Sequence, residues 1–174
     1  PFVGVNGWFE EIYARGFRNP WRMSFDRLTG ALYVADVGEN RIEEVNRVEA
    51  GANHGWPILE GNDCYPLGSN CDPSLYVAPI ATYGHAIGQA IIGGFVYRGC
   101  AFRDLGGLYF YSDNGSGPSP LWSLDVTQDP PVPGPVQVAP EDIGVWVTTF
   151  GEDELGEHYF GTNFSQEIYK IVPP

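Results

Sequence analysis

The chain has 174 residues, which is enough for one domain with its own core. Its formal net charge is −13, from 22 Asp and Glu against nine Lys and Arg, and such a charge disfavours binding to nucleic acid or to an anionic membrane surface. No apolar run approaches the roughly 20 residues of a membrane-spanning helix, so we expect no membrane span.

Gly and Pro, 23 and 15 in number, are spread along the chain and predict many turns and few long helices. Three segments share one pattern: an apolar residue that ends a strand, an acidic turn that closes on Gly, and a strand that contains Tyr. These segments are residues 25–36, 102–113 and 150–162. Each is followed by a further predicted strand, at residues 42–48, 121–126 and 167–172.

The repeat predicts a β-propeller. Tyr109 and Tyr159 lie about 50 residues apart, a period that suits a four-stranded blade. The larger gap between Tyr33 and Tyr109 matches a loop over residues 51–79. Fourth strands are predicted at residues 11–15, 79–83 and 91–97. The expected fold is therefore all-β, with residues 1–174 forming one partial domain of about three antiparallel blades; a small sandwich or another compact β fold is the alternative.

Three blades do not close a ring, because propellers carry four to eight. Such a half would leave apolar blade faces exposed and strand edges unpaired. We therefore expect either an upstream half of a longer protein or a second copy of the chain as a partner.

Cys64 and Cys71 flank a short, turn-rich loop, and their spacing suits a disulfide. Cys100 is left over. A bridge between the first two would indicate an oxidising compartment.

The strongest local motif is Gly16-Phe17-Arg18-Asn19-Pro20, and further motifs follow at residues 32–38, 43–46, 51–57, 92–99 and 149–156. Together these motifs resemble, in order and over essentially the whole chain, the soluble pyrroloquinoline-quinone (PQQ) dependent glucose and aldose sugar dehydrogenases of the glucose/sorbosone dehydrogenase family. Non-catalytic relatives similar to the Hedgehog-interacting protein share this scaffold. The resemblance implies a six-bladed propeller, with cofactor and sugar at one end of the ring, in the periplasm or outside the cell.

The resemblance also implies ligands for the cofactor. Arg18, Asn19 and Arg98 match positions near PQQ, whose carboxylates suit a guanidinium. The alternative for Arg18 is an ion pair that orders the blade, and for Arg98 a solvated charge at a strand end.

Two calcium sites are implied in the same way. The carbonyl groups of Gly38 and Glu39 match ligands of the catalytic calcium, and Glu43 borders that site. Glu44 and the carbonyl of His54 match a second, structural calcium site, since calcium prefers oxygen ligands. The alternatives are an exposed strand acid for Glu44 and a loop histidine without metal for His54.

The sequence departs from the family in three places. The general-base histidine belongs to the N-terminal half, and nothing in this chain matches its context; we interpret His85 and His158 as local structural residues. Trp21 replaces a Gln of the glucose enzymes. The loop at residues 112–118 lacks the arginines that those enzymes offer to the cofactor.

The leading hypothesis is a fragment of a PQQ- and calcium-dependent aldose or glucose dehydrogenase, which oxidises the anomeric hydroxyl of a small sugar. Without the base, the fragment alone is expected to lack turnover. The alternatives are a non-catalytic binding module that presents the loop at residues 53–83, and a half-propeller that closes as a homodimer.

Overall fold

The computed structural model describes residues 1–115, 117–132, 136–137 and 144–172. Short antiparallel strands in three sheets dominate these residues. The first sheet has the order β1 (Pro20–Phe25), β2 (Leu32–Asp36), β3 (Ile42–Val48), β6 (Ala81–Gly84). The second has the order β7 (Ile91–Val96), β8 (Leu108–Asp113), β9 (Leu121–Asp125), β10 (Val136–Gln137). The third has the order β11 (Val147–Glu152), β12 (His158–Thr162), β13 (Ile168–Lys170).

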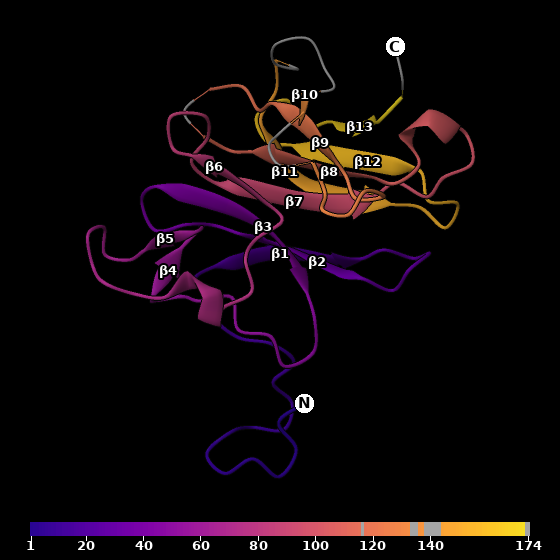
Figure 1. Cartoon of the computed structure of the whole chain (residues 1–174). Helices are drawn as coiled ribbons and strands as arrows, with labels where there is room; N and C mark the ends of the chain where they lie inside the picture. The colour runs from indigo at the N-terminus through magenta and orange to yellow at the C-terminus, as the bar shows by residue number, and fades with distance from the viewer. Residues whose placement is uncertain (116, 133–135, 138–143, 173–174) are drawn as a thin grey trace.

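The three sheets are stacked in chain order, and the N-terminal segment extends away from the first sheet (Figure 1). Smaller elements fill the connections: the hairpin β4 (Leu59–Glu60) and β5 (Asp63–Cys64), and the 3-10 turns η1 (Pro73–Leu75) and η2 (Arg103–Leu105). The described part of the chain contains no helix with the length and hydropathy needed to cross a membrane.

The first strands of the three sheets lie side by side, β1 against β7 and β7 against β11. The hydroxyl of Ser24 on β1 donates to the carbonyl of Gly94 on β7 (2.7 Å), and Arg22 donates to the carbonyl of Phe150 on β11 (2.7 Å). Glycine permits this approach, because a Cβ on Gly93 of β7 would lie 2.7 Å from the Cβ of Ala35 on β2 and 3.4 Å from that of Arg22 on β1. Sheets in series that meet at their first strands are propeller blades, so the chain forms three blades and not a sandwich.

Successive side chains of β7 point to opposite faces of the sheet, as the pleat of a strand requires, and so contact different neighbouring blades. Ile91 packs into the core between the first and second blades, and Ile92 into the core between the second and third. Tyr33 and Tyr109, two of the repeated tyrosines, stack across the first of these cores with ring centroids 5.4 Å apart. Each buried side chain of this size contributes roughly 1.5–3 kcal/mol, so the repeat marks the contacts that hold the blades together.

The predicted strands after the repeats are found as β3, β9 and β13. Three other expectations need correction. Residues 11–15 form no strand, only an isolated parallel bridge from Arg15 to Asn53. Residues 91–97 supply the first strand of the second blade rather than a fourth strand. Phe102 does not end a strand, because β7 stops at Val96 and a longer connection follows.

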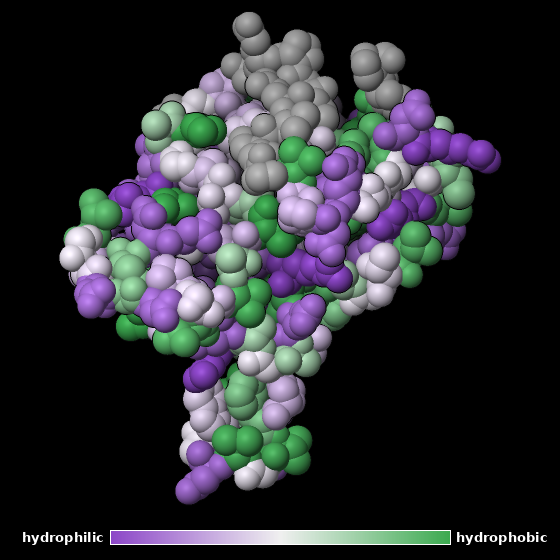
Figure 2. Space-filling model, in the orientation of Figure 1, coloured by the Kyte–Doolittle hydropathy of each residue, from purple (hydrophilic) through white to green (hydrophobic). Residues whose placement is uncertain are grey.

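The two outer faces of the stack are less well covered than the cores. On β1, Met23 and Phe25 are each 60% exposed on the face opposite the second blade. Their cross-strand partners Val34 and Leu32 are buried, packed with Ala14 of the N-terminal segment. That segment projects from the body and carries apolar surface (Figure 2).

The third blade ends in an open groove of about 220 Å³, which is lined by Thr149, Gly151, Tyr159, Gly161 and Ile168 among others. Ile168 is 80% exposed at the edge of the described strands. Both ends of the stack therefore present apolar surface of the kind that a further blade would cover.

Candidate functional site

The strands of the first two blades end at two opposite edges. We name the edge formed by residues 18–19, 36–42, 84–91 and 113–115 the Arg18 end, and the edge formed by residues 26–31 and 97–107 the Asp26 end. The sequence-predicted site residues are divided between these two ends and the neighbouring hairpin.

The backbone before β1 is fixed by Asp36, a buried residue at the end of β2. Its two carboxylate oxygens accept the N–H groups of Arg18 (2.9 Å) and Asn19 (2.7 Å). Burial raises the pKa of Asp36, and these hydrogen bonds oppose that shift. The Arg18 side chain then turns back, donating to Glu39 (2.6 Å) and to the carbonyl of Val37 (3.3 Å).

Arg18 remains partly available to a ligand. Its side chain is 29% exposed, and its Nη2 makes no hydrogen bond or ion pair within the described residues. Beside it, Asn19 and Trp21 line an apolar cavity of about 190 Å³, together with Val37, Ile91, Ile92 and Asn114 among others. A guanidinium next to an apolar cavity suits a flat molecule that carries carboxylates, so Arg18 and Asn19 fit the quinone in residue type and position.

Glu60 shapes the loop that carries Gly38 and Glu39. One oxygen of this buried carboxylate accepts the N–H groups of four consecutive residues, 39 to 42, at 2.9–3.2 Å. Although burial acts to raise it, the pKa of Glu60 is lowered by these hydrogen bonds. The carbonyl of Arg41 in this loop accepts the N–H of His85 (2.9 Å), whereas the carbonyl groups of Gly38 and Glu39 accept no hydrogen bond from the described residues and so could bind a cation.

Glu44 and His54 are brought together by Asn46. The amide of Asn46 donates to Glu44 (3.0 Å), and its oxygen lies 3.0 Å from Nδ1 of His54. Glu44 also accepts the N–H of Gly61 (2.6 Å), and burial raises its pKa to about 7. Within the described residues no three or more His, Cys, Asp and Glu side chains form a metal-binding group. A second cation here would depend on main-chain oxygens.

Arg98 lies at the Asp26 end, so the structure does not bring it to Arg18. Its guanidinium binds both oxygens of buried Asp26, at 2.8 and 2.7 Å. Although burial opposes the shift, hydrogen bonds from Arg98 and Thr29 hold the pKa of Asp26 at about 2. The alternative interpretation of Arg98, a solvated charge at a strand end, does not fit either, because its side chain is only 15% exposed.

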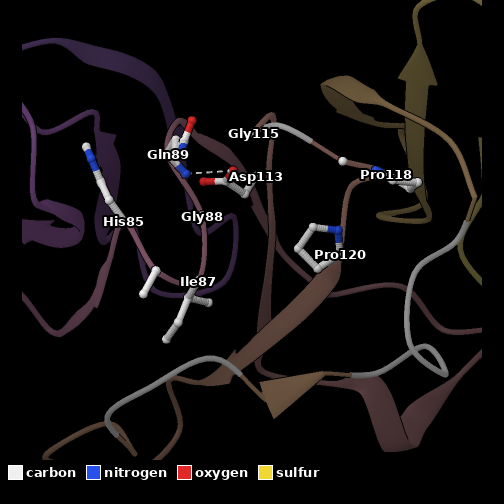
Figure 3. Close-up of a pocket in the computed structure, with 10 residues that line it drawn as sticks. His85, Ile87, Gly88, Gln89, Asp113, Gly115, Pro118 and Pro120 are labelled. Atoms are coloured by element: carbon white, nitrogen blue, oxygen red, sulfur yellow. Dashed lines mark hydrogen bonds between the residues drawn. The ribbon is translucent and has the colours of Figure 1, made fainter.

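Two buried carboxylates at the Arg18 end were not singled out as a pair from the sequence. Glu43 on β3 and Asp113 on β8 both bind the loop at residues 85–91, and Figure 3 shows the Asp113 contact. The pairing of His85 with Glu43 joins positions 42 residues apart, and no local spacing signals it.

Cys64 and Cys71 form a disulfide with a Cα–Cα distance of 5.8 Å. It closes the loop that follows the β4–β5 hairpin, next to the hairpin residue Glu60. Cys100 is free and exposed.

The fold and the clamped loops define a propeller of the sugar dehydrogenase type. The family model described as glucose/sorbosone dehydrogenase matches residues 1–113, and the chain belongs to this family. HIPL1 protein of Arabidopsis thaliana is 30% identical over 94% of this chain, and the Hedgehog-interacting protein of Homo sapiens is 27% identical over 94%.

Among solved structures, a glucose dehydrogenase is similar with a TM-score of 0.78 and 20% identity. The alignment covers 100% of this chain and 50% of that one, so the three blades correspond to half of a six-bladed ring. This chain spans only 28% of HIPL1 and 23% of the Hedgehog-interacting protein.

Proposed function

We propose that residues 1–174 form one partial domain that supplies three of the six blades of a PQQ- and calcium-dependent aldose or glucose dehydrogenase. The observation that carries this proposal is the Arg18 end. There Asp36 fixes the backbone of Arg18 and Asn19 beside an apolar cavity, in a chain of the glucose/sorbosone dehydrogenase family. An aldose or another small carbohydrate is the proposed substrate, oxidised at its anomeric hydroxyl.

The roles of this chain in that reaction are binding and orientation. Arg18 would hold a cofactor carboxylate through its unengaged Nη2, and Asn19 would bind beside it. The carbonyl groups of Gly38 and Glu39 would hold calcium, while Glu60 keeps their loop in place. When bound, the quinone supplies the oxidant and calcium supplies polarisation. Arg98 would act as a positioning residue that orders the β1–β2 turn through Asp26.

The isolated chain is proposed to lack turnover. Its three histidines are His54, His85 and His158, each is held by contacts within the chain, and none matches the sequence context of the general base. His54 binds Asn46, His85 binds Glu43, and His158 is buried among aromatic rings. The base that accepts the sugar proton would come from the other half of the ring.

We also propose that three further blades cover the two open faces. They would come from the rest of a longer protein or from a second copy of this chain. The disulfide supports an oxidising location, periplasmic or extracellular.

Titration of the chain with PQQ and calcium, read by quinone absorbance and by thermal shift, tests the proposed site. We expect a saturable response that Arg18→Ala weakens at least several-fold, while exposed Arg103→Ala at the opposite end leaves it unchanged. An equal response in both variants would remove Arg18 from the site. No response in the wild type would favour a non-catalytic binding module.

A further inference from the structure

The loop between β6 and β7 is held by two buried carboxylates from neighbouring strands. Glu43, which is 0% exposed, lies 2.8 Å from Nε2 of His85 and accepts the N–H of Ile91 at 3.0 Å. Asp113, which is 2% exposed, accepts the N–H groups of Gln89 and Ala90, both at 2.9 Å. The loop is therefore fixed at both its ends before any ligand arrives.

The contact with Glu43 selects one tautomer of His85. A carboxylate can only accept a hydrogen bond, so it favours the form that carries the proton on Nε2. The other ring nitrogen, Nδ1, is then an acceptor, and no described residue donates to it. The His85 side chain is 24% exposed, so this acceptor can be reached from solvent.

His85 lines a cavity of about 190 Å³ between its own loop and the segment that follows β8 (Figure 3). Ile87, Pro118 and Pro120 give the cavity an apolar wall, and exposed Gln89 lies on its polar side. Glycine keeps the space beside Asp113 open, since a Cβ on Gly88 would lie 2.5 Å from the carboxylate. The lining as a whole is more polar than apolar, and a mixed lining of this kind suits a small polar ligand that also has an apolar face.

The charges around the cavity indicate a neutral ligand. Glu43 and Asp113 give the surroundings negative charge, which disfavours an anion. Both oxygens of each carboxylate already accept hydrogen bonds from the protein, including one from the hydroxyl of Tyr83 (2.7 Å) to Asp113, so a cation would have to compete with these hydrogen bonds. A molecule with hydroxyl donors and an apolar ring face remains.

We propose that His85 is a ligand-binding residue, held by Glu43, whose Nδ1 accepts a hydrogen bond from a hydroxyl group of a neutral sugar bound in this cavity. This inference rests on the proposed function, because it deepens the assignment of a sugar as the substrate.

The test is a ¹⁵N spectrum of histidine-labelled chain, which contains three imidazoles. We expect His85 to show the tautomer with the proton on Nε2, and Glu43→Gln to abolish that preference. Addition of D-glucose at millimolar concentration should shift Nδ1 of His85 in a saturable way. The buried imidazoles of His54 and His158 serve as internal controls and should not move.

Two results would overturn the inference: a proton on Nδ1 of His85, or no glucose-dependent shift at this nitrogen. Glucose binding that survives His85→Gln with unchanged affinity would do the same. The tautomer does not depend on ring closure or on the quinone. Failure here, with an intact quinone response, would therefore reject the role of His85 alone, whereas loss of the quinone response would reject the proposed function.

Discussion

Arg18 and Arg98 show how the position of a side chain within a blade decides its role. Both are arginines next to the end of a first strand, but they lie at opposite ends of the blades. Arg18 is bound by half-exposed Glu39, a contact worth only about 0–1 kcal/mol, and it retains a free nitrogen. Arg98 is held by both oxygens of buried Asp26.

Removal of Arg98 should therefore destabilise the fold rather than weaken the cofactor site. Arg98→Met would leave Asp26 buried without its partner, and we expect the free energy of unfolding to fall by roughly 2–4 kcal/mol. Denaturant unfolding measures this change, with exposed Arg103→Met as the control. A variant of unchanged stability but weakened quinone response would contradict this interpretation and return Arg98 to the cofactor site.

His158 should make the fold sensitive to mild acid. It is 1% exposed, and burial lowers its pKa from 6.5 to about 4. The folded state thus binds fewer protons than the unfolded state between these values, so its stability is full above pH 6.5 and falls as the pH drops towards 4. The loss amounts to roughly 3 kcal/mol. Burial lowers the pKa of His54 as well, so it adds in the same direction. Burial raises the pKa of Glu44 to about 7, and this carboxylate acts in the opposite direction over the same pH range, so the contribution of His158 is read from a comparison of variants.

Unfolding measured between pH 7 and 4 checks this prediction. His158→Phe should lose less stability than the wild type as the pH falls from 7 to 4, because an aromatic ring that cannot titrate replaces the imidazole beside Tyr97 and Phe110. The control substitution Tyr159→Phe, at the next position in the chain, should retain the pH dependence of the wild type. If the slope of stability against pH is the same in His158→Phe and in the wild type, His158 is not the titrating group.

Among the elements, the strands could be predicted from the sequence far better than the loops. Alternating apolar residues and Gly-containing turns identified β3 and β9 nearly to the residue. The loops depend on carboxylates that come from distant positions. Glu60 binds residues 39–42 from the other side of β3, and Glu43 binds a histidine 42 residues away. Hydrogen bonds of this range leave no local pattern, so Glu60 was missed.

In the segment before β1, by contrast, the sequence predicted a strand that the structure does not contain. Residues 11–15 contain the short apolar run Ile12-Tyr13-Ala14, which suits a strand, but they form only one bridge with Asn53. The edge of the first sheet next to β1 is adjoined by β7, and β6 already provides the fourth strand. Tertiary context therefore decided against the local pattern.

The loop at residues 38–42 should tolerate no side chain at Gly38. An added Cβ would lie 2.0 Å from the carbonyl oxygen of Ile42, a backbone atom that cannot move without disturbing the bonds to Glu60. We expect Gly38→Ala to reduce the free energy of unfolding by about 2–4 kcal/mol and to speed hydrogen exchange of the N–H groups bound to Glu60. In the control Gly84→Ala, the new Cβ makes an ordinary contact at 3.6 Å. Equal effects of the two substitutions would contradict the described packing.

At the scale of the whole molecule, the chain is an open stack. The same pleat that fills the two inter-blade cores also places apolar side chains on the outer faces. Met23 and Phe25 occupy one outer face, and the groove beside Ile168 occupies the other. In a symmetric dimer, each outer face of one copy would pack against the other outer face of its partner. Such a dimer would contain six blades in a closed ring.

The most direct test of this account is the molar mass of the isolated chain in solution, measured by light scattering after size exclusion. The account predicts a mass of at least twice the 19.1 kDa of one chain. Met23→Glu combined with Phe25→Glu should lower that mass to one chain, whereas the same change at exposed Leu67 and Leu75, outside the blade faces, should not. A monodisperse wild-type chain of 19.1 kDa would contradict the account.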